Sequence, residues 1–168
     1  APGAAGWLAG QISHFKPVCI VNATSFSGKG ASGISPLDAG QVPVFQIALS
    51  TANRSAWAEA DRGLSPADMA MHVVLPEVDG RLFAGIASFK EAGSPDDLLE
   101  FSRIMHQPDM NRIDAVADKI SRWRKLQTTP LAAQKPALIL STYPGRPWQM
   151  AHAVGLDALA SAEAILQD

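Results

Sequence analysis

The stretch Val18-Cys19-Ile20-Val21 decides the fold, because it sets a continuous apolar run between Pro17 and a Gly- and Ser-rich segment at 22–41. A short apolar run bounded by turn formers is typical of a buried strand. Upstream, helical spacing connects four apolar residues, Trp7, Leu8, Ile12 and Phe15, until Pro17 ends the pattern. The chain therefore begins with a helix that leads into a buried strand.

Further apolar runs predict strands at 42–49, 71–75, 82–89 and 137–141. Helices are predicted between and after them, at 52–60, 65–68, 94–105, 113–123 and 158–166, several with Ser-Pro or Asp start signals. Near-continuously apolar strands that alternate with helices predict an α/β fold. We expect a mostly parallel sheet with helices on both faces, Rossmann-like or flavodoxin-like.

Composition limits the domain number and the partners. The 168 residues are 47% hydrophobic, which suits one core, so we expect 1–168 to be a single α/β domain or sub-domain excised from a longer chain. The net charge of -2 and the lack of a basic cluster argue against a nucleic-acid partner. No apolar run approaches the roughly 20 residues of a membrane span, and we expect a cytoplasmic protein.

Cysteine and histidine give no metal or disulfide framework. The one cysteine, Cys19, lies in an apolar run, and no two of the four histidines have the spacing of a helical zinc motif. His72 and His152 lie near the two segments described below. Each is either a ligand or proton-transfer residue or an ordinary hydrogen-bonded imidazole.

A phosphate-binding loop is excluded at Ser27-Gly28-Lys29-Gly30. A P-loop needs a Gly five residues before the Gly of its Gly-Lys pair and a Ser or Thr after the Lys, and these positions hold Ala23 and Gly30. We therefore expect this chain to bind neither ATP nor another cofactor.

The most informative segment is Met71-His72-Val73-Val74-Leu75-Pro76-Glu77-Val78-Asp79-Gly80-Arg81. If 71–75 is a strand, Glu77 emerges just beyond its carboxyl end, where open α/β sheets bind ligands. A second segment, 141–146, carries Tyr143 and Arg146, which can hold a carboxylate-bearing ligand. The structural alternatives are two turns and a solvated Glu77, and Trp123 fits the core better than a cofactor contact.

Several motifs in order resemble a known family, the large subunits of cobaltochelatase and magnesium chelatase. They are Asn22-Ala23-Thr24-Ser25-Phe26, Pro43-Val44-Phe45-Gln46, Leu75-Pro76-Glu77-Val78-Asp79-Gly80-Arg81, the helix around Trp123, Tyr143-Pro144-Gly145 and Gly155-Leu156-Asp157. The turn at 79–81 and the element at 155–157 resemble the cobalt branch. The segment at 147–151 departs from the pattern.

The resemblance implies an ATP-dependent reaction that inserts cobalt into a corrin ring. In it, this subunit holds the corrin or tetrapyrrole and the metal, and separate ATPase subunits are its partners. It implies Glu77 as base or transient metal ligand. We add His72, Arg81, Tyr143 and Arg146 as substrate-binding candidates. Two alternatives stay open: a non-catalytic ligand-binding or docking module of similar architecture, and a small self-contained enzyme using Glu77 with His72.

Overall fold

The structure is a computed structural model that describes residues 3–30, 32–96, 98, 100–141, 151 and 155–167. The chain divides into two compact units, Ala1–Gln127 and Thr128–Asp168. The expectation of one domain or sub-domain stays a prediction.

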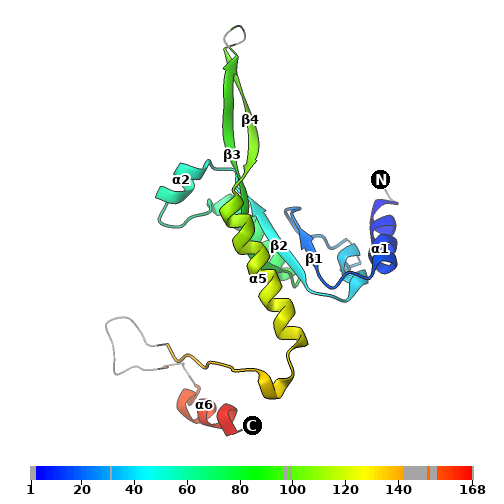
Figure 1. Cartoon of the computed structure of the whole chain (residues 1–168), viewed down its shortest axis with the longest axis vertical. Coiled ribbons are helices and arrows are strands. Elements are labelled where there is room, and N and C mark those ends of the chain that lie inside the picture. Colours follow the sequence, from blue (N-terminus) through cyan, green and yellow to red (C-terminus); the bar gives the residue numbers. More distant parts are fainter. Residues whose placement is uncertain are drawn as a thin grey trace. The chain divides into compact units, whose positions relative to one another are not determined.

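The first unit is built on a four-stranded sheet in the order β1-β2-β3-β4 (Figure 1). The strands are Ile20–Asn22, Val44–Leu49, Leu82–Asp96 and Phe101–Pro108. β1, β2 and β3 run parallel, and β4 returns antiparallel along β3 as a hairpin. Because the strand order follows the chain, each connection joins neighbouring strands.

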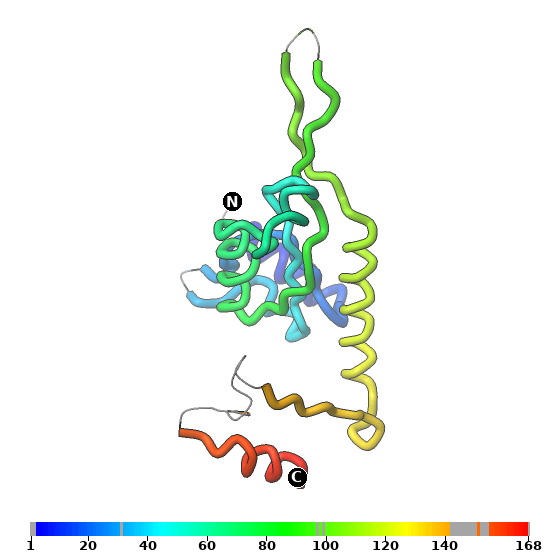
Figure 2. The backbone as a smooth tube through the Cα atoms, turned by 90° about the vertical axis from the view of Figure 1, so that its left-hand side faces the viewer, coloured from blue at the N-terminus to red at the C-terminus, as the bar shows by residue number. Residues whose placement is uncertain are grey.

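Helices cover both faces of this sheet (Figure 2). Helix α5 (Met110–Thr128) packs Val116 and Ile120 against Phe45 and Ala84. On the other face, Ala48, Leu64, Ile86 and Phe89 form a second apolar cluster, joined by Trp57 of α2 (Arg54–Glu59) and by Val73. The predicted α/β class, with mostly parallel strands and helices on both faces, is confirmed.

The N-terminal part follows the sequence closely. Helix α1 (Ala4–Phe15) ends at Lys16, which adopts a left-handed backbone with φ of 47° just before Pro17. The 3-10 helix η1 (Pro36–Gly40) interrupts the long loop, and Ser35 and Asp38 cap it reciprocally. Gly40 lies close against Ile12 of α1, so the loop is held beside the first helix.

The strand predicted at 71–75 is wrong. Those residues lie in a helix that runs from α3 (Pro66–Met69) through a π-helical turn, η2 (Ala70–Val74), to α4 (Leu75–Val78). Ser65 starts the helix by accepting a hydrogen bond from Asp68 N at 3.0 Å. Asp68, His72 and Pro76, spaced four residues apart, are its buried side chains. Periodicity cannot separate so short an apolar run from a buried helical segment.

Pro76 explains the π-helical turn. Proline has no N–H, and its ring would press on the carbonyl four residues earlier, so the helix widens before it. Leu75 N donates to Ala70 O, five residues back. The residue five after Met71 is Pro76 itself, and Met71 O instead accepts from Phe26 N at 2.8 Å. The loop after β1 is thereby attached to this helix.

The helix predicted at 94–105 is also wrong. β3 continues to Asp96, and β4 begins at Phe101, so the segment is the far end of a hairpin. The Ser-Pro-Asp sequence that can start a helix also consists of turn formers. Here Asp96 Oδ1 accepts from Leu98 N at 3.0 Å within the turn.

The second unit contains the 3-10 helix η3 (Leu131–Ala133) and helix α6 (Ala158–Gln167). The predicted start of α6 is confirmed, since Asp157 Oδ1 accepts from Ala160 N at 3.0 Å. Residues 137–141, predicted as a strand, have no regular secondary structure. Within the described ranges, no helix combines the length and apolar character needed to cross a bilayer.

Candidate functional site

The Glu77 pocket is a hollow of about 410 Å³ beside α5. Its lining residues are Phe45, Glu77, Gly80, Arg81, Leu82, Phe83, Lys119 and Trp123. A hollow of this size, largely apolar with a few charged groups at its edge, has the character of a small-molecule site. Of the five predicted site residues, the structure brings Glu77 and Arg81 together here.

Glu77 reaches this pocket from the last turn of α4. Its carbonyl accepts from Gly80 N at 2.8 Å, and Gly80 takes a φ of 84°, so the chain turns sharply into β3 at Leu82. Glu77 therefore precedes the amino end of β3. The expectation that it follows the carboxyl end of a strand is wrong, because the segment before it is helical.

Trp123 and Lys119 form the α5 side of the pocket. Trp123 is 40% exposed, and its ring meets Phe45 edge to face with centroids 6.0 Å apart. Lys119, one turn earlier, donates from Nζ to Phe83 O at 2.7 Å. Sequence reasoning assigned Trp123 to the core and missed Lys119. The signal was their four-residue spacing, which puts a cation and an aromatic ring on one edge of the apolar stripe.

Arg81 is buried at 5% exposure and holds a polar network together. Its Nη2 pairs with Asp79 Oδ2 at 3.2 Å, and its Nη1 donates to Gln46 Oε1 at 3.2 Å. Asn22 Nδ2 donates to the same Gln46 oxygen at 2.7 Å. We call Asn22, Gln46, Asp79 and Arg81 the Arg81 network. Because its groups satisfy one another, Arg81 positions the α4–β3 turn as well as lining the pocket.

The network also fixes the loop after β1. Ser27 Oγ and Gly28 N donate to the two carboxylate oxygens of Asp79, at 2.7 and 2.6 Å. Gly28 suits this position, because a Cβ there would collide with the Arg81 guanidinium and force it out of its hydrogen bonds. Burial alone would raise the pKa of Asp79. The hydrogen bonds from Ser27 and Gly28 and the charges of Arg81 and Lys29 outweigh it, so its pKa lies below the ordinary value.

His72 lies in a different cluster, next to the carboxyl end of β2. Asp68, which is fully buried, accepts from Thr51 N at 2.9 Å and from Ser50 Oγ at 3.3 Å. Burial lowers the pKa of His72 below 6.5, the Asp68 charge opposes this, and His106 adds to the lowering. His72 Nδ1 is buried without a hydrogen-bond partner in the described part of the chain.

This cluster extends onto the hairpin, where His106 Nδ1 and Ser88 Oγ are 3.1 Å apart. Sequence reasoning kept His72 but missed Asp68, Ser88 and His106. The four-residue spacing of Asp68 and His72 was the available signal, and reading 71–75 as a strand concealed it. His106 had none, since it was placed in a loop just after the helix predicted at 94–105.

Two predicted site residues, Tyr143 and Arg146, lie outside the described residues, as does His152. Among the residues that are described, no three His, Cys, Asp or Glu side chains gather as a metal site would require. Among the described residues, the candidate site is therefore the Glu77 pocket together with the Arg81 network.

Comparison with known proteins assigns the family. The profile described as CobN/Magnesium Chelatase matches residues 7–168. This chain belongs to that family. The aerobic cobaltochelatase subunit CobN of Pseudomonas aeruginosa is 39% identical over 150 residues, 88% of this chain, and that of Sinorhizobium sp. is 34% identical over 164 residues, 96% of it. The predicted family resemblance is confirmed.

A solved relative supports the same assignment. The catalytic subunit of cobaltochelatase from Mycobacterium tuberculosis is 31% identical and matches 99% of this chain with a TM-score of 0.69. The CobN-family relatives are far longer than this chain, which spans 12% and 13% of the two curated subunits and 14% of the solved one.

Proposed function

We propose that this CobN-family chain is part of the subunit of an ATP-dependent cobaltochelatase that holds tetrapyrrole and metal while cobalt enters a corrin ring, a step of cobalamin biosynthesis. The observation that carries the proposal is the family match over residues 7–168, together with relatives that are cobaltochelatase subunits. In this proposal, separate ATPase subunits are the partners and supply the nucleotide-driven step. A cytoplasmic location remains a prediction.

The chemistry assigned to Glu77 is proton removal and transient metal contact. Cobalt, the metal substrate, can form bonds only to ring nitrogens that have lost their protons, and a carboxylate can accept a proton or hold the cation briefly. Glu77 is exposed, and the pocket that it lines includes Phe83 and Trp123, whose partly exposed rings offer a flat ligand an apolar surface. These features support the proposed role.

The substrate-binding candidates differ in what supports them. Arg81 lines the pocket, but Asp79 and Gln46 hold its guanidinium, so it contributes by orienting one wall. His72 belongs to the Asp68 cluster and needs a ligand that reaches the carboxyl end of β2. The contacts proposed for Tyr143 and Arg146 rest on the sequence alone.

The test replaces Glu77 with Gln in an intact subunit of the relatives' length, assayed with its ATPase partners. Gln keeps the size and removes the charge, so we expect cobalt insertion to fall about tenfold or more, with an unchanged melting temperature. Glu59→Gln, at an exposed position of α2 outside the pocket, is the matched control and should insert cobalt normally. If Glu77→Gln inserted cobalt at the normal rate, Glu77 would be a surface residue without a role in insertion.

A second candidate function is a non-catalytic docking module. It is favoured by the exposed apolar side chains at the far end of the β3–β4 hairpin, where Leu98 of the turn and Phe101 and Ile104 of β4 are 95%, 59% and 65% exposed. Trp fluorescence separates the two, because a bound tetrapyrrole quenches Trp123 and a docking module shows no such quenching.

A further inference from the structure

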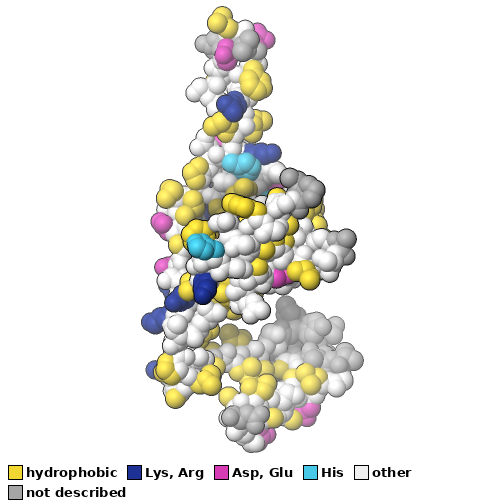
Figure 3. Space-filling model, turned by 90° about the vertical axis from the view of Figure 1, so that its right-hand side faces the viewer, with side chains coloured by type: hydrophobic (Ala, Val, Ile, Leu, Met, Phe, Trp, Pro, Cys, Tyr) yellow, Lys and Arg dark blue, Asp and Glu magenta, His cyan; other side chains and the backbone are white. Residues whose placement is uncertain are grey.

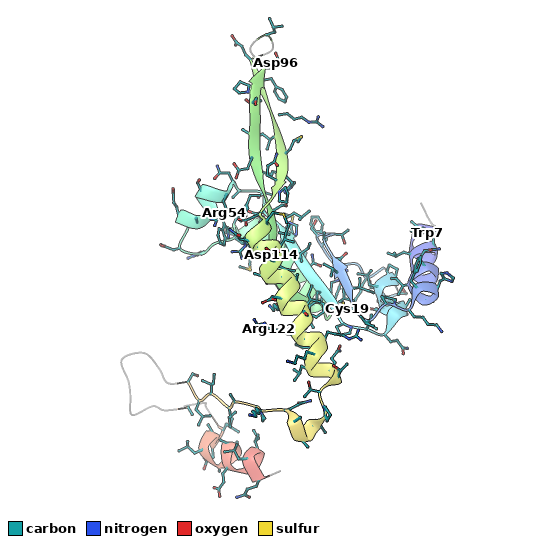
Figure 4. All side chains as sticks on the ribbon, in the orientation of Figure 1. Trp7, Cys19, Arg54, Asp96, Asp114 and Arg122 are labelled. Atoms are coloured by element: carbon teal, nitrogen blue, oxygen red, sulfur yellow. The ribbon has the colours of Figure 1, made fainter. Side chains whose placement is uncertain are left out.

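The outer hairpin, residues 90–96 of β3 with all of β4, extends beyond the other two strands of the sheet. Figure 1 shows it projecting from the sheet, and Figure 4 places Asp96 at its far end and Arg54 near its base. In Figure 3 hydrophobic side chains recur along it. A two-stranded ribbon alone is marginal in water, so natural proteins cover or interrupt such edges.

One edge of β3 is open where β2 ends. Ser50 N donates to Ser88 O at 2.9 Å, and Lys90 N donates to Ala52 O at 3.1 Å, after which the chain turns away into α2. Backbone groups alternate in direction along a strand, so the N–H and C=O of Ala92 face this same edge. In the part of the chain that the structure describes, no strand lies beside Ala92 there.

A hollow adjoins this open edge. It measures about 760 Å³ and is lined by Thr51, Ala52, Asn53, Ala56, Lys90, Glu91, Ala92 and Ile104. Glu91 Oε1 already accepts from Arg54 N at 2.8 Å, which holds the start of α2 against the hairpin. The small side chains of Ala52, Ala56 and Ala92 leave room for another backbone to approach.

The open edge is short. Between Ala92 and Pro95 the register shifts, so that Gly93 and Ser94 face Arg103 alone. Pro95 then has no N–H to offer. Another strand can therefore pair with β3 at residues 90–92, which border the hollow, but not at residues 93–95.

We propose that an extended segment of the same, longer polypeptide adds to β3 as a strand at residues 90–92 and places a small or apolar side chain in the hollow beside Ile104. The matching part of each long relative is 12% to 14% of one continuous polypeptide. A segment of that polypeptide is present at a high effective concentration, which favours it over a second copy or a separate protein.

Hydrogen exchange tests the proposal. We would compare the 168-residue chain with a subunit of the relatives' length that carries these residues. The Ala92 amide should exchange roughly tenfold or more slowly in the longer polypeptide, as for a newly formed backbone hydrogen bond. That protection should not depend on protein concentration. Amides 89 and 91, which face β4, serve as internal references because the hairpin protects them in both forms.

Two variants in the longer polypeptide sharpen the result. Ala92→Pro removes the N–H at the open edge, and Ala92→Val retains it with a better strand former. Lys90 N–H already donates to Ala52 O and so cannot report on the added strand. The amides of the incoming segment, outside these 168 residues, should lose their protection in the first variant and keep it in the second. Equal exchange in the short and long wild-type chains would overturn the proposal. So would protection that rises with protein concentration or that requires another protein, since these would identify a second copy or a separate partner.

Discussion

At the scale of single residues, His72 combines burial with an unpartnered ring nitrogen. It is 6% exposed, and its Nδ1 has no hydrogen-bond partner among the described residues. Burial favours the neutral imidazole, and this outweighs the attraction of Asp68, so the pKa lies below 6.5 in the folded protein. The unfolded chain therefore binds a proton at His72 more readily than the folded chain does.

This difference predicts a pH-dependent stability. As pH falls from about 6.5 toward the folded pKa of His72, the unfolded state takes up the proton first, so the free energy of unfolding decreases. Above about pH 7 the contribution is constant. Urea unfolding at a series of pH values should show this slope in the wild type and a smaller one in His72→Asn, which cannot titrate.

His14 supplies the control, because it lies exposed at the end of α1 and shows no comparable burial. His14→Asn should keep the wild-type slope. If His72→Asn and His14→Asn changed it equally, the proton uptake assigned to His72 would have to come from elsewhere.

At the scale of elements, Trp57 joins α2 to β3 and to the start of α5. Its ring lies 5.3 Å from that of Phe89, and the guanidinium groups of Arg54 and Arg112 lie 5.0 and 4.5 Å from its centroid. Arg54 also pairs with Asp109 at 2.9 Å. This stack holds α2 where it borders the open edge of β3.

Trp57→Ala should lower the free energy of unfolding by about 2 to 3 kcal/mol, since it removes a half-buried aromatic ring and two cation–π contacts. Urea midpoints with an unchanged slope measure this. Trp7→Ala is the matched control, because Trp7 is 67% exposed on α1 and its removal should cost almost nothing. Equal losses in the two variants would show that the Trp57 stack contributes no specific stability.

The elements also show how far sequence patterns reach. The runs at 42–49 and 82–89 and the stripe on α5 predicted their elements because each pattern had a clear period or a clear boundary. The strand prediction at 71–75 failed because so short a run, four apolar residues and His72, fits a strand and a buried helix equally. The segment at 94–105 failed because antiparallel pairing with a distant partner, not local propensity, made it a strand.

The candidate site also contains residues that the sequence predicts and residues that only the fold brings together. Glu77 and Arg81 were found because they lie in one contiguous motif. Lys119 and Phe45 are distant in the sequence from that motif, and only the contact between α5 and the sheet brings them to Glu77. Asp79 was read as a turn residue, and its second role as the acceptor for Ser27 and Gly28 depends on a loop 51 residues away.

At the scale of the whole molecule, the loop after β1 bears on the proposal that other subunits, and not this chain, bind ATP. Its backbone amides are already engaged: Gly28 N donates to Asp79 at 2.6 Å, and Lys29 N donates to Ser27 Oγ at 3.2 Å. A bound phosphate would have to displace the Asp79 carboxylate and would meet its negative charge. The loop therefore fixes the Arg81 network and is unsuited to an anion.

We accordingly predict that the 168-residue chain neither binds nor hydrolyses ATP. Two independent observations support this. Ala23 and Gly30 lie at the positions where a P-loop needs Gly and Ser or Thr, respectively. The N–H of Gly28 already donates a hydrogen bond to Asp79. Calorimetric titration with magnesium and ATP should give only the heat of dilution, under conditions in which a P-loop ATPase gives a full binding curve. Stoichiometric binding in the micromolar range would contradict the prediction and, with it, the proposal that separate ATPase subunits supply the nucleotide-driven step.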